Sequence, residues 1–152
     1  MKKCCFAGHS DIHDETIKEK IYIEAERLYR EQGVKAFWVG DYGAFDRYSA
    51  SVIEKLKKKY PDITLELVIP YLTKRIICNK EHYHYFNNII IADIPQNTLP
   101  RVKIIKANEY MVNKCEYLIS FIEHTWGGAY KTYMYANRKK HIEVINIGNL
   151  KK

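Results

Sequence analysis

Apolar residues recur every three or four positions in several stretches of the chain, which is the spacing of a helix with one buried face. The stretch from Thr16 to Gln32 has this pattern, and Gly33 follows it where a helix C-cap glycine would stand. The stretch over 45–60 keeps the pattern most clearly, and Pro61 ends it. The same spacing predicts further helices over residues 101–114 and 129–139, and the segment over 71–88 is interpreted as a loop with a short helix over 81–87.

Short apolar runs alternate with these helices and predict strands. They are brief and often end in glycine or proline, as expected for strands that are covered on both faces. Strands are expected over residues 3–7, Ala36–Val39, Thr64–Ile69, 89–94, 117–122 and 143–147, with 3–7 in the centre of the sheet. The alternation predicts a single α/β domain over residues 1–152, a doubly wound, mostly parallel sheet with helices on both faces.

Composition places the chain among ordinary globular proteins. Of its 152 residues, 47% are hydrophobic and 28% are charged, which excludes a disordered tail, a coiled coil and a collagen-like chain. The apolar runs fall far short of the roughly 20 residues that span a bilayer. The first residues do not resemble a signal peptide. We therefore expect a soluble, cytoplasmic protein without a membrane partner.

The net charge of +7 makes an anionic partner plausible, whether nucleotide, phosphate or nucleic acid. The basic residues are scattered, however, and the densest run, at 57–59, falls on the polar side of a predicted helix. A nucleic acid is therefore a less favoured partner than a small nucleotide. Assembly into a homo-oligomer is left open by the sequence.

Cysteine and histidine give little sign of a metal site or a redox pair. Cys78, His82 and His84 have a spacing that matches no common structural zinc pattern, and no fourth ligand is evident. Cys4 and Cys5 are neighbours on a predicted strand and should point to opposite faces of the sheet. We therefore expect no metal and no required cofactor.

Three glycine-containing loops follow predicted strands and lead into predicted helices. They are Gly8-His9-Ser10, Gly40-Asp41-Tyr42-Gly43 and Thr125-Trp126-Gly127-Gly128. Glycine lets the backbone approach a ligand closely, and a helix N-terminus adds free N–H groups and partial positive charge. Ligands of open α/β sheets bind at the carboxyl ends of the strands. The three loops together predict a site for a phosphate-bearing nucleotide, although the usual nucleotide fingerprints are absent from the sequence.

Five segments, in chain order, resemble the motifs of the SLOG superfamily, which includes the YpsA-like proteins, the LOG phosphoribohydrolases and DNA-processing protein A. Residues 40–50, GDYGAFDRYSA, resemble its G-x-x-G-x-F-D-x-x-A-A stretch, and 5–9 resemble its opening strand and T-G-H-R loop. Residues 108–112 resemble its R-N-x-x-M-V helix, 116–119 the strand that follows, and 126–136 its G-G-T-x-x-T-x-x-Y-A loop and helix. The likeness covers nearly the whole chain.

This resemblance, most specific for the YpsA-like branch, implies a Rossmann-like fold that binds nucleotides or nucleotide-derived ligands such as ADP-ribose. Together with the loop pattern it gives a set of expected ligand-binding residues. They are Gly8, His9, Ser10, Gly40, Gly43, Phe45, Asp46, Asn108, Met111, Thr125, Gly127, Gly128, Lys131 and Thr132.

The sequence also departs from the family pattern. Ser10 and Ala107 stand where the family has arginines, so two phosphate clamps are missing. In the LOG enzymes a proline precedes the glycine pair and a glutamate follows it. Here these positions hold Trp126 and Met134. Methionine cannot move a proton, which argues against LOG-type hydrolysis.

Asp46 and His9 are the candidates for acid–base chemistry, and any catalytic role is left open. Asp46 opens the most regular helix, where it could either favour the helix dipole or bind ribose hydroxyls. We therefore expect a nucleotide or nucleotide-sugar binding protein that acts as a sensor or regulatory module. The alternatives are an N-glycosidic hydrolase or transferase, like a phosphoribohydrolase or a deoxyribosyltransferase, and a nucleic-acid binder.

Overall fold

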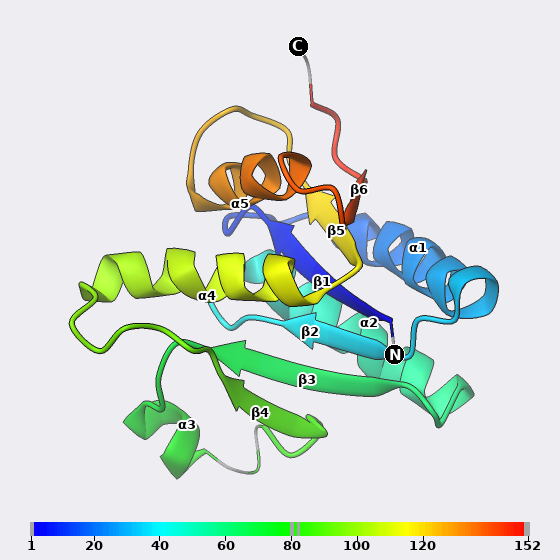
Figure 1. Cartoon of the computed structure of the whole chain (residues 1–152). Helices are drawn as coiled ribbons and strands as arrows, with labels where there is room; N and C mark the ends of the chain where they lie inside the picture. The colour runs from blue at the N-terminus through cyan, green and yellow to red at the C-terminus, as the bar shows by residue number, and fades with distance from the viewer. Residues whose placement is uncertain (1, 80, 82, 151–152) are drawn as a thin grey trace.

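The computed structural model describes residues 2–79, 81 and 83–150, and within this part of the chain six parallel strands form one sheet in the order β4-β3-β2-β1-β5-β6 (Figure 1). The strands are β1 (Lys3–Gly8), β2 (Ala36–Val39), β3 (Thr64–Ile69), β4 (Asn88–Ile91), β5 (Tyr117–Phe121) and β6 (Glu143–Asn146). The helices are α1 (Thr16–Gln32), α2 (Ala44–Lys59), α3 (Lys74–Cys78), α4 (Pro100–Lys114) and α5 (Gly128–Asn137). The predicted α/β class and parallel sheet are confirmed.

The direction in which strands are added reverses at β1. From β1 the chain adds β2, β3 and β4 on one side, and then crosses to the other side to add β5 and β6. Cys4 pairs with Phe37 of β2 and with Tyr117 of β5, and Gly8 pairs with Phe121 at the carboxyl end. β1 is therefore the central strand, and the point of reversal lies between β1 and β5.

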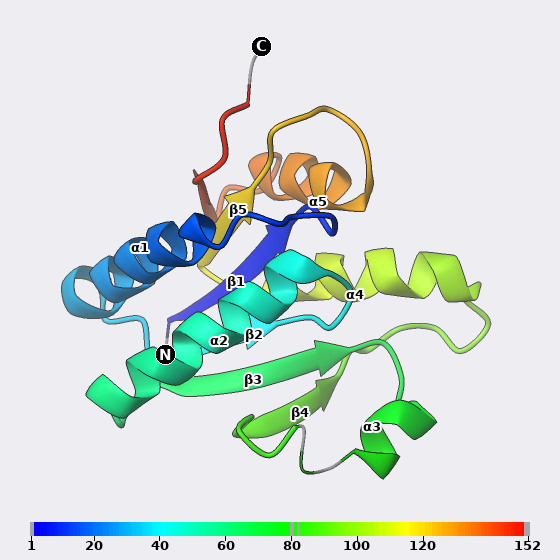
Figure 2. The ribbon, with the colours of Figure 1, turned by 180° about the vertical axis from the view of Figure 1, so that it is seen from behind.

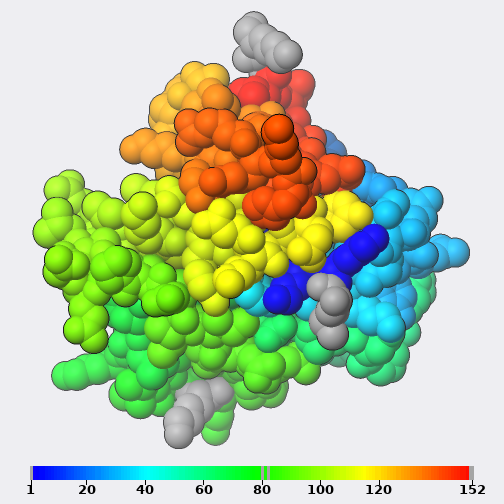
Figure 3. Space-filling model, viewed as in Figure 1, coloured from blue at the N-terminus to red at the C-terminus, as the bar shows by residue number. Residues whose placement is uncertain are grey.

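Helices cover both faces of the sheet. α1 and α2 lie on one face, and α4 and α5 lie on the other (Figures 1 and 2). In the space-filling view, α4 and α5 occupy the middle and the top of this face, and the β3–β4 part of the chain lies below them (Figure 3). The doubly wound arrangement follows from strands that have apolar side chains on both sides.

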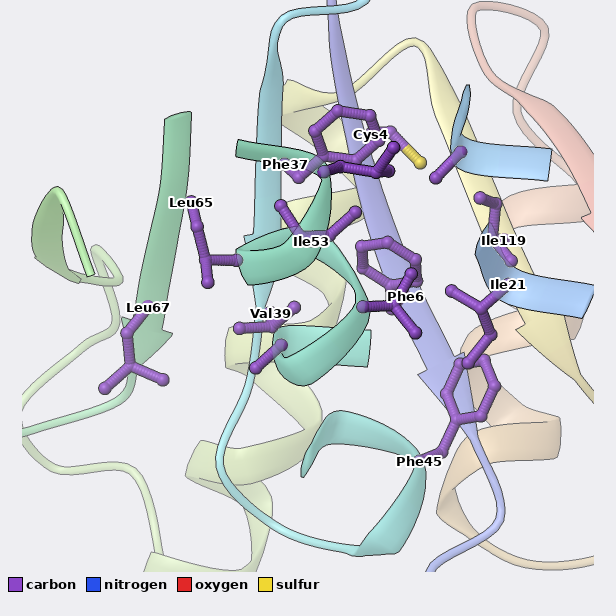
Figure 4. Packing of buried hydrophobic residues seen from close by; sticks show 14 of the residues in the cluster. Cys4, Phe6, Ile21, Phe37, Val39, Phe45, Ile53, Leu65, Leu67 and Ile119 are labelled. Atoms are coloured by element: carbon purple, nitrogen blue, oxygen red, sulfur yellow. The ribbon is translucent and has the colours of Figure 1, made fainter. Parts of the chain in front are cut away.

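Two hydrophobic cores fill the spaces between the sheet and its helices. The core under α1 and α2 contains Phe6 and Phe37, whose rings lie 6.2 Å apart (Figure 4). The core under α4 and α5 contains Trp38. Cys4 belongs to the first core and Cys5 to the second, so the two neighbours point to opposite faces as predicted.

Glycine ends α1 where the sequence predicts it. Gly33 has the left-handed conformation, with φ of 74°, and follows the last residue of the helix. This conformation is readily available only to glycine. The C-cap prediction is confirmed.

The segment between β3 and β4 differs from the sequence prediction. A helix was expected over 81–87, but the described residues there form turns, and the short helix is α3, which Thr73 caps by accepting a hydrogen bond from the N–H of Ile76. Tyr83 is buried and donates a hydrogen bond to Asp41 at 2.9 Å. Its neighbours Tyr85 and Phe86 also pack against the core, but without forming a helix. The strand predicted over 89–94 is β4, which is shorter and runs from Asn88 to Ile91.

Two further sequence expectations concern metals and membranes. His82 lies outside the described residues, and among those that are described no group of three or more His, Cys, Asp or Glu side chains could hold a metal ion. No helix in the described part of the chain has the length and apolar character needed to cross a bilayer.

Candidate functional site

A pocket of about 560 Å³ opens at the carboxyl ends of β1 and β2 and beside the β5–α5 loop. Its walls are residues 6–11 of β1 and the loop after it, the start of α2 with the loop before it, part of α4, and the loop that leads into α5. In a doubly wound sheet, the connections on the two sides of the reversal point leave toward opposite faces and open a crevice between them. The pocket lies in that crevice.

Two glycines let the loop after β1 lie directly on the start of α2. A β-carbon on Gly8 would come within 2.3 Å of the ring of Phe45, and one on Gly43 would come within 2.8 Å of Cα of Ser10. The N–H of Ala44 donates a hydrogen bond to the carbonyl oxygen of Ser10 at 3.1 Å. Space, rather than backbone conformation, requires glycine here, because φ of Gly43 is −179°.

Asp46 lines the pocket from the first turn of α2. The pKa of its carboxyl is raised to about 6, chiefly by burial and also by the nearby Asp41, against the hydrogen bond from Tyr42 and the charge of Arg47. The backbone N–H of Tyr42 donates this bond to Oδ2 at 2.9 Å. A β-carbon on Gly40 would lie 3.2 Å from the same oxygen. The pocket wall therefore carries a carboxylate that is mostly ionised at pH 7 and takes up a proton when the pH falls to about 6.

Three rings stack one on another in the wall that β1 and the β5–α5 loop form. The ring centroids of His9 and His124 lie 3.6 Å apart at an interplanar angle of 12°, and those of His124 and Trp126 lie 3.7 Å apart at 16°. His9 is 7% exposed, whereas Trp126 is 67% exposed. The stack thus runs from the protein interior to the surface.

His9 is held as a neutral ring. Its Nε2 accepts a hydrogen bond from the backbone N–H of Glu123 at 3.0 Å, which places the proton of the neutral ring on Nδ1. Burial lowers the pKa of His9 from 6.5, and the neighbouring His124 lowers it further, against the charges of Asp11 and Glu123. Nδ1 of His124 is buried and has no hydrogen-bond partner among the described atoms.

The glycine pair after the stack opens α5. Gly127 has φ of 93°, which favours glycine, and Gly128 is the first residue of the helix. A β-carbon on either residue would meet no described atom within 4 Å. Thr132 donates its hydroxyl to the carbonyl oxygen of Gly128 at 3.1 Å. The first backbone N–H groups of α5 therefore stand at an open part of the pocket.

The structure brings eight of the residues expected from the sequence into the pocket wall: Gly8, His9, Ser10, Gly43, Asp46, Asn108, Gly127 and Gly128. The remaining six lie behind the wall or beside it. Phe45, Met111 and Thr132 are buried and support the wall from within. Gly40 leaves room for the carboxylate of Asp46, and Thr125 and Lys131 are exposed.

Sequence reasoning missed or undervalued several lining residues. Trp126 lay in one of the predicted glycine loops but was not among the expected ligand-binding residues, and His124 was not among them either. Asp11, Tyr42 and Ile104 also line the pocket. An aromatic residue inside a glycine loop after a strand was the available signal for Trp126. No lysine or arginine is among the lining residues within the described part of the chain, and Met134 is not among them either.

The comparison with protein families matches this architecture to a known group. The YpsA family model, described as the YspA SLOG family, matches residues 3–148. The chain belongs to this SLOG family. A search of curated proteins found no significant match.

Solved structures show where the SLOG fold of this chain recurs. The X-ray structure of DNA processing protein A (DprA) from Streptococcus pneumoniae is similar, with a TM-score of 0.69 and 14% sequence identity. The likeness covers 95% of this chain and 50% of DprA, so the chain spans about half the length of that protein. At this identity the likeness establishes the Rossmann-like α/β fold.

Proposed function

We propose that this SLOG protein binds a nucleotide or a nucleotide sugar of the ADP-ribose type and acts as a sensor or regulatory module. The observation that carries the proposal is the pocket of about 560 Å³, into which the first residues of both α2 and α5 reach. Its volume lies within the usual range for small-molecule sites, roughly 300–1,000 Å³. Two helix N-termini at one pocket favour an anionic ligand.

The charged and polar groups in the wall suggest which residues bind the phosphate and which bind the ribose of such a ligand. Backbone N–H groups at Gly127 and Gly128 are the proposed phosphate donors, since the lining lacks described lysine and arginine. The carboxylate of Asp46 is the proposed acceptor for ribose hydroxyls, and it is mostly ionised at pH 7 because its pKa is about 6. The side-chain amide of Asn108 is a second polar group in the wall.

One observation favours a catalytic alternative. A carboxyl group with a pKa of about 6 can both release and take up a proton near neutral pH, as a general acid or base must. Asp46 would then serve N-glycosidic hydrolysis or transfer in place of the glutamate that the LOG enzymes use. Nucleic-acid binding, which the name of DprA suggests for that protein, comes last here because the pocket wall carries acidic and not basic side chains.

Calorimetric titration with AMP, ADP-ribose, NAD and nucleoside phosphates tests the proposal. A true ligand at about 100 times its Kd should also stabilise the protein by roughly 2.7 kcal/mol. Asp46→Asn keeps the acceptor oxygen for Tyr42 but removes the charge, and it should weaken binding by about 1–2 kcal/mol, the difference between a charged and a neutral acceptor. Glu54→Gln removes a charge from the same helix outside the pocket and serves as the matched control.

The outcomes separate the functions. Absence of binding by all of these compounds would overturn the proposal. Release of a free base from a bound nucleotide, lost in Asp46→Asn and kept in Glu54→Gln, would establish the enzyme instead.

A further inference from the structure

Trp126 combines two properties that rarely occur together. Its side chain is 67% exposed, yet its ring is held flat against His124, which is held in turn against the buried His9. A scattered apolar side chain on a surface needs no explanation. A tryptophan that lines a pocket as the last ring of an ordered stack is different, because its orientation is already fixed before anything binds.

The outer face of this stack is open. Among the described residues, no other ring contacts Trp126 besides His124. The stack also contains the buried Nδ1 of His124, which has no described hydrogen-bond partner. The ring of His124 is enclosed between those of His9 and Trp126, so the face of Trp126 that remains accessible is the one turned away from the stack.

We propose that the free face of Trp126 stacks on the nucleobase of the bound nucleotide, so that the base becomes the fourth ring of the column. The inference rests on the proposed function and names the part of the site that binds the base. Aromatic side chains bind the π-faces of bases in a sequence-tolerant way. A ring whose position is already fixed loses little freedom on binding, which increases the affinity.

The position of Trp126 in the chain suits a nucleotide. Gly127 and Gly128 follow it directly, so the stacking ring and the first N–H groups of α5 belong to one loop. The base is that of a small nucleotide rather than of a nucleic-acid strand. A strand needs a basic groove along its backbone, whereas this wall contains Asp11 and Asp46 and no described lysine or arginine.

AMP and ribose 5-phosphate test the inference, because they differ only at C1 of the ribose, where a hydroxyl group replaces the adenine. Trp126→Ala should weaken AMP binding by about 10- to 100-fold and leave ribose 5-phosphate binding unchanged. Trp126→Phe retains a flat ring and should keep most of the affinity. Leu99→Ala removes another side chain that is 67% exposed, away from the pocket, and should change neither affinity. ADP-ribose replaces AMP in the same comparison if AMP alone binds too weakly to titrate.

Fluorescence gives a readout that a merely structural role would not move. The chain has two tryptophans, of which Trp38 is 4% exposed and Trp126 is 67% exposed, so iodide quenches mainly Trp126. AMP should shield Trp126 from iodide, and ribose 5-phosphate should not.

Three results would overturn the inference while the proposed function stands. They are unchanged AMP affinity in Trp126→Ala, equal weakening of AMP and ribose 5-phosphate, and AMP binding without shielding of Trp126. Tighter binding of single-stranded oligodeoxyadenylate than of AMP or ADP-ribose would identify a nucleic-acid base instead, which also overturns it. Failure of wild type to bind any nucleotide would overturn the proposed function itself.

Discussion

Gly43 lies so close to Ser10 that a β-carbon at position 43 would come within 2.8 Å of both Cα and Cβ of Ser10. This contact joins the loop after β1 to the start of α2, and Ala44 ties the same two segments by a backbone hydrogen bond. We expect Gly43→Ala to push the loop away and to lower the free energy of unfolding by about 1–3 kcal/mol.

Denaturant unfolding measures this effect, and Gly128→Ala is the matched control. The control places a methyl group where no described atom lies within 4 Å, so it should leave stability unchanged or slightly higher. Equal stabilities of the two variants would show that the loop yields to the added methyl group without loss.

The two glycines before and at the start of α5 should respond differently to substitution. Gly127→Ala forces a residue with a β-carbon into φ of 93° and should lower the free energy of unfolding by about 1–2 kcal/mol. Gly128→Val meets open space, so the protein should fold, but the new side chain occupies the pocket and should abolish nucleotide binding. Circular dichroism melts and calorimetry together distinguish the two effects. Wild-type affinity in Gly128→Val would place the ligand elsewhere.

Asp46 should give the protein an unusual pH dependence. Its pKa is about 6 in the folded protein against 3.8 for a freely solvated aspartate, so the folded state binds the proton more tightly. The free energy of unfolding should therefore rise as the pH falls from 7 toward 4. At pH 7 the ionised carboxylate destabilises the folded wild type by up to about 3 kcal/mol. Asp46→Asn should be more stable than wild type at pH 7, and most of this difference should be lost by pH 4.

His9 has the opposite effect on the pH dependence of stability. Its pKa is lowered from 6.5, so acidification below that value destabilises the fold. Subtracting the unfolding free energies of Asp46→Asn from those of wild type at each pH removes this contribution, because Asp46 is not among the groups that shift His9. A difference that stays constant from pH 7 to pH 4 would refute the assignment to Asp46.

Asn146 holds the end of β5, from which the aromatic stack begins. Its Oδ1 accepts from the N–H of Ile122 at 2.9 Å and from that of Gly148 at 3.1 Å, and its Nδ2 donates to the carbonyl oxygen of Ile122 at 3.1 Å. Asn146→Ala leaves partly buried groups unpaired and should lower the free energy of unfolding by about 1–3 kcal/mol. Asn113→Ala removes one exposed hydrogen bond to Tyr135 and should have a much smaller effect in the same unfolding measurement.

The fold could be predicted because its signals are local. The helical spacing over 16–32 with Gly33 behind it, and the apolar runs at β2 and β3, each reflect burial along a single element. The failure lies over 81–87, where Tyr83 and its aromatic neighbours pack against the core through turns. Thr73, whose side chain caps α3, was the local signal that went unused.

The candidate site could be predicted only in part, because it is built from residues that are far apart in the chain. The glycine loops could be predicted, because each is a short run of consecutive residues after a predicted strand. The stack of His9, His124 and Trp126 did not, because positions 9 and 124 meet only when Gly8 pairs with Phe121. The raised pKa of Asp46 likewise follows from burial that no single segment reveals.

Because the direction of strand addition reverses at β1, the two sides of the pocket come from two parts of the chain that meet at the β1–β5 pairing. The β1–β5 pairing joins residues more than a hundred positions apart, as in the hydrogen bond from Lys3 to Glu116 with a separation of 113. Bringing such distant residues together costs conformational entropy, because a long loop has to close. His9 belongs to the β1 side of this pairing and His124 to the β5 side, so a ligand that contacts both walls would hold the two sides together. Filling the pocket would then also raise the free energy of separating the two parts of the sheet, because binding and folding are thermodynamically linked.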